Sequence, residues 1–435
     1  MYGKKWAGFL LILFFVAGMV FAGGQGESAA AADGPVTLNV LNYGDMATAE
    51  GQSWETLMEQ FAEAYPEIQV QSETLYDEAY HQKATASLVA GEVPHIMYLW
   101  PGPRSSYAFD AEVVVDQRDY IDTNKFTEAA MAPQGANGEI WEVPLNVGIT
   151  SVLFVNKAAL AELGLEMPKT YADLKAMVEP AKAAGKIVLS LAGGEAWVNN
   201  SCYLGTAVGR FAGPGFIDAA VRGEKSFTDP AFVKALEFLG TMVQDGVLPR
   251  TTVQTDYGTA LSNFVNGKAL FMLDGHWRSG AIEDAAFASN VGMAVLPAIP
   301  GENTRYAGSA SGVVSPGYAL TTAAVEGDPK VLDAAKKLLM FIAGEQGSAV
   351  RFAAMGWLPA YKMDLDWSVV DSEAARITGQ EKADLYNNVP LLTDVPDAFI
   401  PAAANDVLNT GMQEILLGER TAAEVAASLE EAMNR

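Results

Sequence analysis

Hydrophobic and polar residues follow one another in patterns that predict strands and helices in turn. Residues 36–40 alternate apolar and polar side chains, which predicts a strand. Between 54 and 65, apolar residues recur at helical spacing, which predicts a helix with Ser53 as its N-cap and Pro66 as its stop. A second strand begins at 68–70. This strand–helix–strand start favours a parallel sheet of the α/β class.

The same alternation continues toward the C-terminus. Apolar runs at 96–99 and 151–156 predict two more strands. Four later helices are marked by capping residues: Thr170 with Asp173 for a helix through Ala184, Asp229-Pro230 for a helix ended by Gly246, Asp328-Pro329 for a helix through Ile342, and Thr421 with Glu424 for the last helix. No repeat of fixed period and no long linker interrupts the pattern, so we expect interleaved rather than consecutive domains.

Residues 1–22 carry a different pattern. Two lysines precede an apolar stretch at 6–21, and the small residue Ala22 follows it, which is typical of a secretory signal. The alternative is a retained N-terminal anchor, but about 16 apolar residues are few for a membrane span. The only cysteine, Cys202, lies far from the expected cleavage point, so we expect no lipid anchor. These features predict a soluble protein exported to a periplasm.

Composition narrows the classes of function. Of the 435 residues, 53 are acidic and 28 are Lys or Arg, a formal net charge of −25, whereas a nucleic-acid binder needs a basic surface. One cysteine excludes an intramolecular disulfide and a cysteine-built zinc site, and three histidines leave little for a histidine-based metal site. We therefore expect no metal, no cofactor and no nucleic-acid partner.

Several segments, in this order along the chain, carry a family resemblance. They are Asn137–Pro144 (Asn-Gly-x-x-x-x-Val-Pro), Leu153–Lys157, Pro168–Leu174 with Tyr171 where the family has Trp, Phe264–Ala269 (Phe-x-x-Gly-Lys-Ala) and Gly275–Trp277. Together with the opening strand and helix, they resemble the extracellular solute-binding proteins of sugar ABC importers, the group that includes the maltose-binding protein. The resemblance runs from about residue 36 to the C-terminus.

The resemblance implies a two-lobed periplasmic-binding-protein fold of type II, with α/β lobes that are interleaved in sequence and a ligand cleft at the hinge. It places the crossovers between the lobes near 144–149, 311–314 and 355–358. Lobe one is then expected at 35–147 and 313–355, and lobe two at 148–312 and 356–435. A cleft at the hinge agrees with the tendency of open α/β sheets to bind ligands beyond the carboxyl ends of their strands.

A sugar presents apolar C–H faces that suit aromatic rings, and hydroxyls that need hydrogen-bond partners. The aromatic candidates for such a site are Tyr43, Trp100, Trp197, Trp277 and Trp357. The polar candidates are Asp45, Asn146, Glu195, Asn199, Asp274, Arg278, Ser309 and Ser311. The alternative role is core packing for each Trp and ordinary turn chemistry for each polar residue. His95 stands where many family members have Asp, and we expect it to be structural.

Two classes of function stay open at this point. The first is a monomeric binding protein that closes on a neutral sugar and presents it to a membrane permease, or the same fold binding a phosphorylated polyol or a polyamine. Scattered arginines argue against a phosphate, whereas acidic candidates leave a polyamine open. The second class is a secreted carbohydrate-active enzyme that uses a carboxylate pair. Because the resemblance spans the chain after the leader, we expect a binder and no enzyme.

Overall fold

The computed structural model describes residues 34–434 apart from 133, 136 and 284. The secretory signal expected at 1–22 lies outside the described residues. Residues Val36–Arg435 form one compact unit, which contains two α/β lobes. Within the described part, no helix combines the length and the apolar character that crossing a membrane requires.

Lobe one is built on a five-stranded sheet with the order β2-β1-β3-β11-β4. Its strands are β1 (Val36–Tyr43), β2 (Ile68–Leu75), β3 (Ile96–Leu99), β4 (Val143–Pro144) and β11 (Gly317–Leu320). β1 runs parallel to β2 and β3, but β11 is antiparallel to both of its neighbours. The expected parallel sheet is therefore correct only for the first three strands. β11 returns from the other lobe, and its first residue, Gly317, pairs with the last residue of β3, Leu99, so its direction is reversed.

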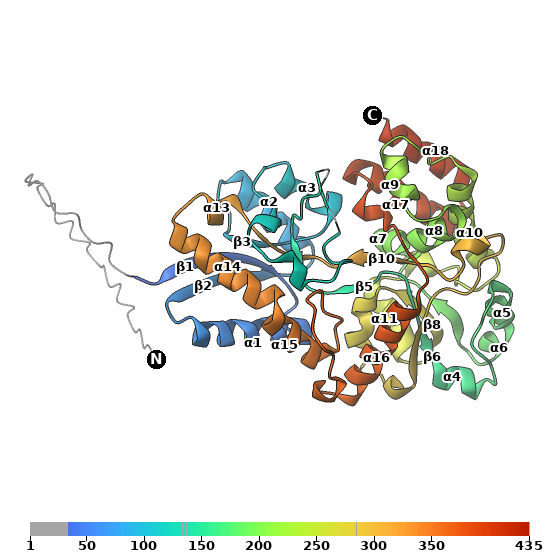
Figure 1. The fold of residues 1–435 in the computed structure, drawn as a ribbon. Helices are drawn as coiled ribbons and strands as arrows, with labels where there is room; N and C mark the ends of the chain where they lie inside the picture. The colour runs from blue at the N-terminus through green and yellow to red at the C-terminus, as the bar shows by residue number, and fades with distance from the viewer. Residues whose placement is uncertain (1–33, 133, 136, 284, 435) are drawn as a thin grey trace, which may run out of the picture. The chain divides into compact units, whose positions relative to one another are not determined.

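The helices of lobe one come from both ends of this part of the chain. α1 (Ala49–Ala64) packs against α14 (Pro329–Ala343) and α15 (Glu345–Met355), while α2 (Glu78–Val89) follows β2. In Figure 1 the orange α14 and α15 accordingly lie among the blue N-terminal elements. The expected cap at Ser53 is wrong, because Thr48 accepts the capping hydrogen bond from Gly51 N. Ser53 is buried inside the helix, and its hydroxyl donates to Ala49 O at 2.7 Å.

Lobe two has a four-stranded sheet with the order β7-β8-β6-β9. Its strands are β6 (Val152–Asn156), β7 (Ile187–Ser190), β8 (Ala269–Asp274) and β9 (Val291–Ala294), and only β7 and β8 are parallel. The helices are α4 (Lys157–Glu162), α5 (Tyr171–Ala176), α6 (Val178–Ala183), α7 (Ala196–Asn199), α8 (Gly205–Ala212), α9 (Phe216–Val221), α10 (Pro230–Gln244), α11 (Tyr257–Val265), α12 (Ser279–Ile282), α16 (Glu373–Asn388), α17 (Ala402–Leu417) and α18 (Ala422–Met433). α17 and α18 pack on α10, so the C-terminus completes this lobe.

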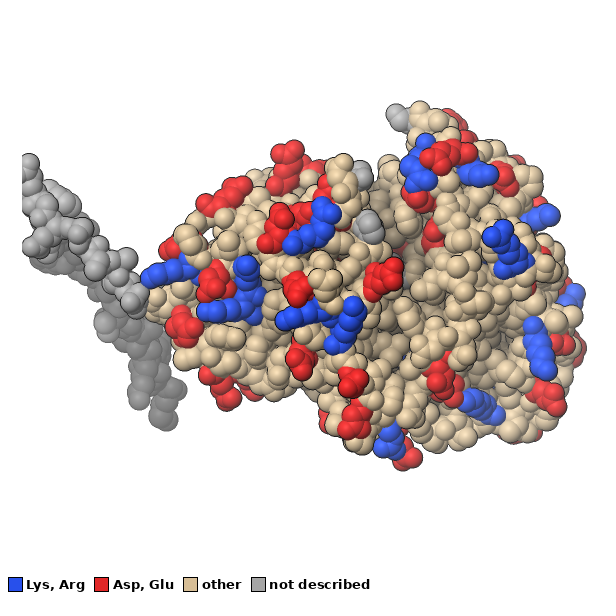
Figure 2. Space-filling model, viewed as in Figure 1, with Lys and Arg blue, Asp and Glu red and all other residues tan. Residues whose placement is uncertain are grey.

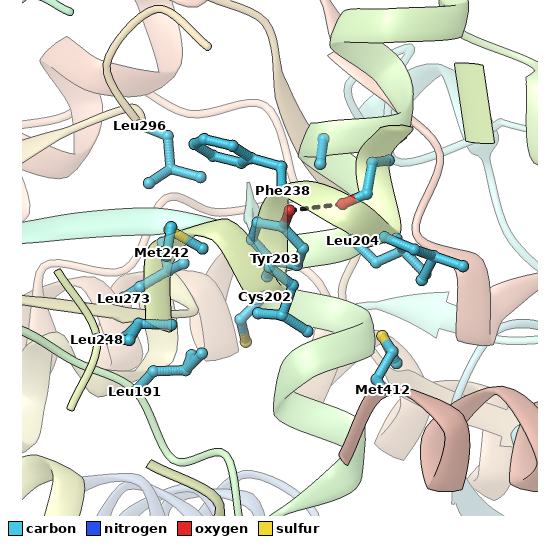
Figure 3. Close-up of a cluster of buried hydrophobic side chains, with 14 of the residues drawn as sticks. Leu191, Cys202, Tyr203, Leu204, Phe238, Met242, Leu248, Leu273, Leu296 and Met412 are labelled. Carbon is cyan, nitrogen blue, oxygen red and sulfur yellow. Dashed lines mark hydrogen bonds between the residues drawn. The ribbon is translucent and has the colours of Figure 1, made fainter. Parts of the chain in front are cut away.

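The core of lobe two joins segments that are distant in sequence. Tyr203, which is fully buried, packs against Phe238 of α10 and donates its hydroxyl hydrogen bond to Ala235 O at 2.6 Å. Figure 3 shows Met242 and Met412 in the same cluster, contributed by α10 and α17. This packing fixes the five-residue π-helical turn Asn200–Leu204, and that turn carries one residue of the site described below.

The capping residues predict the helix starts correctly. Thr170 with Asp173 and Thr421 with Glu424 form reciprocal capping boxes, and the two Asp-Pro pairs cap α10 and α14. The helix expected from Thr170 to Ala184 is, however, divided into α5 and α6. Pro180 lacks the N–H that would bond the carbonyl of Ala176, where α5 ends, so an unbroken helix is not available there.

Three short strands form a separate sheet with the order β12-β10-β5. β5 (Val147–Ile149) pairs antiparallel with β10 (Ala310–Val314), and β12 (Leu392–Thr393) pairs with β10 on its other side. The crossovers implied near 144–149 and 311–314 thus contain β5 and β10. The stretch expected as the third crossover, 355–358, leads instead into backbone that hydrogen-bonds with lobe one, since Thr127 N bonds Ala360 O and Lys362 N bonds Lys125 O, both at 2.8 Å.

Candidate functional site

A cleft of about 320 Å³ lies between the lobes and takes its lining from both. Lobe one contributes Tyr43, Glu50, Tyr76, Asp77, Trp100, Pro101, Arg104 and Pro316; lobe two contributes Thr150, Glu195, Trp197, Ser201, Tyr257, Trp277, Val395, Asp397 and Ala398. Tyr43 ends β1, Tyr76 follows β2 and Trp100 follows β3, so the cleft lies beyond the carboxyl ends of three parallel strands.

The wall from lobe one is aromatic. The ring of Tyr43 stacks on Tyr98 with centroids 5.5 Å apart, and meets Trp100 edge-on at 4.8 Å and Tyr76 at 5.4 Å. The backbone N–H of Trp100 donates to Ser105 Oγ at 2.8 Å, which fixes the turn after β3. Burial raises the pKa of Tyr43 well above its ordinary value, so its hydroxyl stays protonated and can both donate and accept.

The wall from lobe two is a second aromatic group. Trp197, at the start of α7, lies 5.1 Å from the ring of Tyr257 and 6.2 Å from that of Trp277. The indole Nε1–H of Trp277 donates to the Tyr257 hydroxyl at 2.7 Å. Tyr257 begins α11, whose first turn is held by Asp256. These contacts hold Trp197, Tyr257 and Trp277, which come from three separate segments, in one aromatic surface.

A buried ion pair supports this wall from behind. The Arg278 guanidinium lies 3.2 Å from the ring centroid of Tyr257, and its Nη2 donates to Tyr257 O at 2.6 Å. Its Nε donates to Asp274 Oδ2 at 3.1 Å, and the other carboxylate oxygen accepts from Gly275 N at 2.7 Å. Asp274 is 1% exposed, so the pair is shielded from water. Asp274 and Arg278 therefore position Tyr257 and Trp277 and are not part of the cleft lining.

The polar groups of the cleft are mainly carboxylates. Glu50, Asp77, Glu195 and Asp397 line it, against one guanidinium, Arg104, whose Cζ lies 4.8 Å from the ring centroid of Trp100. Asp397 accepts a hydrogen bond from Ser201 Oγ at 2.5 Å. Burial raises the pKa of Asp397, while Ser201 and the charge of Arg104 act in the opposite direction. Carboxylates, hydroxyls and aromatic faces together can surround a ligand rich in hydroxyl groups.

Glu50 makes the stability of this lobe depend on pH. Burial raises the pKa of this half-buried carboxyl from 4.5 to about 7, opposed by the buried Arg351. The contribution of protonated Glu50 is therefore complete below pH 4.5 and is lost as the pH rises toward 7. Relative to Glu50→Gln, the ligand-free wild type should lose about 1–2 kcal/mol of unfolding free energy over this range, allowing for its partial exposure.

Urea unfolding at intervals from pH 4.5 to 8 measures this difference. The control is Glu55→Gln, which changes an exposed carboxyl on the same helix and should follow the wild type at every pH. A constant difference between the wild type and Glu50→Gln across the range would contradict the prediction.

The predicted site residues separate into two groups. Tyr43, Trp100, Glu195, Trp197 and Trp277 line the cleft. The other eight predicted residues do not line it: Asp45, Asn146, Asn199, Asp274, Arg278, Ser309, Ser311 and Trp357.

Most residues of the second group form hydrogen bonds with neighbouring protein groups. Asn199 Nδ2 donates to Gly193 O at 3.2 Å, and Ser309 Oγ donates to Tyr306 O at 2.7 Å. Asn146 Oδ1 lies 3.2 Å from His276 Nε2, and Ser311 Oγ lies 2.9 Å from Thr150 Oγ1, within the crossover region. Asp45 accepts from Ala47 N in its own turn. His95, expected to be structural, accepts a hydrogen bond from Asn39 N at 2.9 Å and does not line the cleft.

Sequence reasoning missed several lining residues. Tyr76 follows β2 just as Trp100 follows β3, so the rule that selected Trp100 could have selected it. Arg104 lies four residues beyond Trp100 in the same turn and could have been included with it. Asp397 and Tyr257 had no local signal, because their segments reach the cleft only through the packing of lobe two.

Within the described residues, no group of three or more His, Cys, Asp or Glu could hold a metal ion.

Comparisons with known proteins agree with this architecture. A family model for bacterial extracellular solute-binding proteins matches residues 47–349. The chain is 27% identical over 169 residues to a multiple sugar-binding protein of Streptococcus mutans, covering 37% of this chain and 39% of that protein. It is 32% identical over 146 residues to a probable sugar-binding periplasmic protein of Mesorhizobium japonicum, covering 33% and 34%. The aligned part thus spans well under half the length of these relatives.

Solved structures match the fold over nearly the whole chain. A chitin oligosaccharide binding protein superposes with a TM-score of 0.77 at 22% identity, covering 92% of this chain and 98% of that one. The maltose/maltodextrin-binding domain MalE of Bdellovibrio bacteriovorus, bound to maltotriose, superposes with a TM-score of 0.71 at 19% identity, covering 92% and 99%. With its two lobes, its aromatic-walled cleft and a family model that matches most of its length, the chain belongs to the family of bacterial extracellular solute-binding proteins.

Proposed function

We propose that this protein is the sugar-binding component of an ABC importer, which holds a sugar between its lobes and delivers it to a membrane permease. The observation that carries the proposal is the pair of aromatic walls, one on each lobe, with carboxylates and hydroxyls in the same cleft. Aromatic faces bury the C–H surface of a sugar ring, and the polar groups bond its hydroxyls. The sugar-binding names of two relatives point the same way.

A neutral sugar is the first candidate ligand. A phosphorylated ligand would require cationic partners, but among the described residues Arg104 is the one guanidinium that lines the cleft, and it already lies over Trp100. The lining carboxyl groups that are ionised would also repel an anion. The same carboxylates, set among aromatic rings, favour a polyamine as the second candidate, because both cation–π contacts and ion pairs would be available.

Capture of the ligand requires two lobes that can move relative to each other. We place lobe one at about 36–147 and 315–371 and lobe two at about 148–314 and 372–434, revising the boundary near 355 because Asp371 N still bonds Ala353 O at 2.8 Å. The paired strands β5 and β10 are then the hinge about which the lobes rotate. Closure over the ligand presents one conformation to the permease, and opening releases the sugar into it.

The proposal also covers the export, the oligomeric state and the activity of the protein. Residues 1–22 direct export and are removed, and the mature protein acts as a soluble monomer in a periplasm. It binds the sugar without chemical change and has no enzymatic activity.

Ligand-dependent stability tests this proposal. The protein without residues 1–22 is melted alone and with mono-, di- and oligosaccharides and with spermidine; ligand at 100 times its Kd adds about 2.7 kcal/mol of stability. A rise in Tm with one sugar, recovered intact by chromatography, supports the proposal. A rise with spermidine alone supports the second candidate. A cleaved sugar would overturn the binding role in favour of a carbohydrate-active enzyme.

A further inference from the structure

Two turns from opposite lobes meet backbone to backbone at the cleft. One is Gly102–Ser105, which follows β3 in lobe one, and the other is Pro396–Ala398, which precedes α17 in lobe two. A Cβ placed on Gly102 would lie 2.0 Å from Ala398 O, 2.8 Å from its carbonyl carbon and 3.2 Å from its Cα. These are the three nearest atoms outside the adjacent residues of the chain, so the closest obstacle belongs to the other lobe.

The same two turns carry opposite charges. Arg104 and Asp397 both line the cleft, and the positive charge of Arg104 acts on the Asp397 carboxyl. Asp397 is held in place by Ser201 Oγ at 2.5 Å, which belongs to the π-helical turn anchored in the core of lobe two. Arg104 lies over the ring of Trp100 in lobe one. Arg104 and Asp397 therefore line the same cleft from opposite lobes with opposite charges.

We propose that Gly102, Arg104, Asp397 and Ala398 form an interlobe latch that stabilises the closed cleft and slows release of the ligand. The latch rests on the proposed function, because a ligand must be held for its release to be slowed. Rotation of the lobes apart would separate Gly102 from Ala398 and increase the distance between the opposite charges of Arg104 and Asp397, so both interactions would favour the closed form. A change confined to them lowers the closed population and weakens apparent binding by the same factor.

Gly102 allows a test with a closely matched control. Its φ is +73°, so alanine there introduces backbone strain in both the open and the closed forms. Gly91, in the same lobe, has φ +75° and nothing within 4 Å of an added Cβ. Gly91→Ala thus reproduces the strain without the contact to Ala398. A difference between the two variants reports the interlobe contact alone.

The measurement is ligand binding by calorimetry and release by stopped-flow fluorescence, with the sugar or spermidine that stabilises the wild type. Gly102→Ala should raise Kd at least about tenfold, mainly through faster release, while Gly91→Ala stays within about twofold. Equal Kd values for the two variants would overturn the latch and leave the proposed function standing. A wild type that binds none of these ligands would refute the proposed function, and the latch with it.

The charged half of the latch is tested by a double-mutant cycle. Arg104→Gln and Asp397→Asn each remove one charge, and Asn keeps an acceptor for Ser201. If the charges act on each other across the cleft, each single change should raise Kd several-fold and the double change should raise it by less than the product of the two effects. Multiplicative effects would contradict this half of the latch.

Discussion

Trp197→Ala is expected to weaken sugar binding by about 2 kcal/mol, roughly thirtyfold in Kd, the largest effect on affinity that we anticipate from one cleft residue. Trp197 lines the cleft and packs against both Tyr257 and Trp277, so its truncation removes apolar surface and leaves a gap in the wall of lobe two. Calorimetric titration with the sugar that stabilises the wild type measures the change.

Two variants make this result specific. Trp197→Phe keeps an aromatic face and should recover most of the affinity. Trp357→Phe changes a half-buried tryptophan outside the lining and should bind as the wild type does. Unchanged affinity in Trp197→Ala would show that the lobe-two wall does not contact the ligand.

Asp274→Ala is expected to cost about 3–5 kcal/mol of unfolding free energy, because it leaves the Arg278 guanidinium without its carboxylate in a site shielded from water. Binding should weaken as well, since Arg278 holds the ring of Tyr257 and Tyr257 accepts the hydrogen bond of Trp277. Urea unfolding measures the first effect and calorimetric titration the second.

The chain offers a matched control for this ion pair. Asp218 and Arg222 have the same residue types and the same spacing of four, but both are exposed, so Asp218→Ala should cost less than about 1 kcal/mol. Similar losses in Asp218→Ala and Asp274→Ala would contradict the role given to burial. Loss of stability in Asp274→Ala without any loss of affinity would separate Asp274 from the cleft wall.

The sequence correctly predicts the starts of helices whose capping interactions lie within a few residues of one another. The Asp-Pro starts of α10 and α14 and the capping boxes of α5 and α18 involve residues within four positions of one another, so the sequence contains all of each interaction. The reversed direction of β11 depends instead on a crossover from the other lobe. Residues 317–320 alone do not predict that direction.

The candidate site likewise contains residues that local sequence predicts and residues that only long-range packing positions. Trp100 could be predicted because it directly follows a strand whose carboxyl end faces the cleft. The sequence predicts Asp274, Trp277 and Arg278 in one loop, but Asp274 ends β8 and the other two lie in the 3-10 turn His276–Arg278. The sequence does not show which of these side chains face the cleft. Asp274 and Arg278 both turn toward Tyr257, a partner in α11 that is fixed only by the packing of the lobe.

The interleaving of the lobes has a consequence for synthesis. Lobe one lacks β11, α14 and α15 until residue 355 has been made, and lobe two lacks α17 and α18 until residue 433. Neither lobe therefore has all of its elements until most of the chain has been translated, although N-terminal domains commonly fold first. Contacts between such distant segments also make folding slow. Lobe one can therefore be completed before lobe two, whose last helices are the final elements to leave the ribosome.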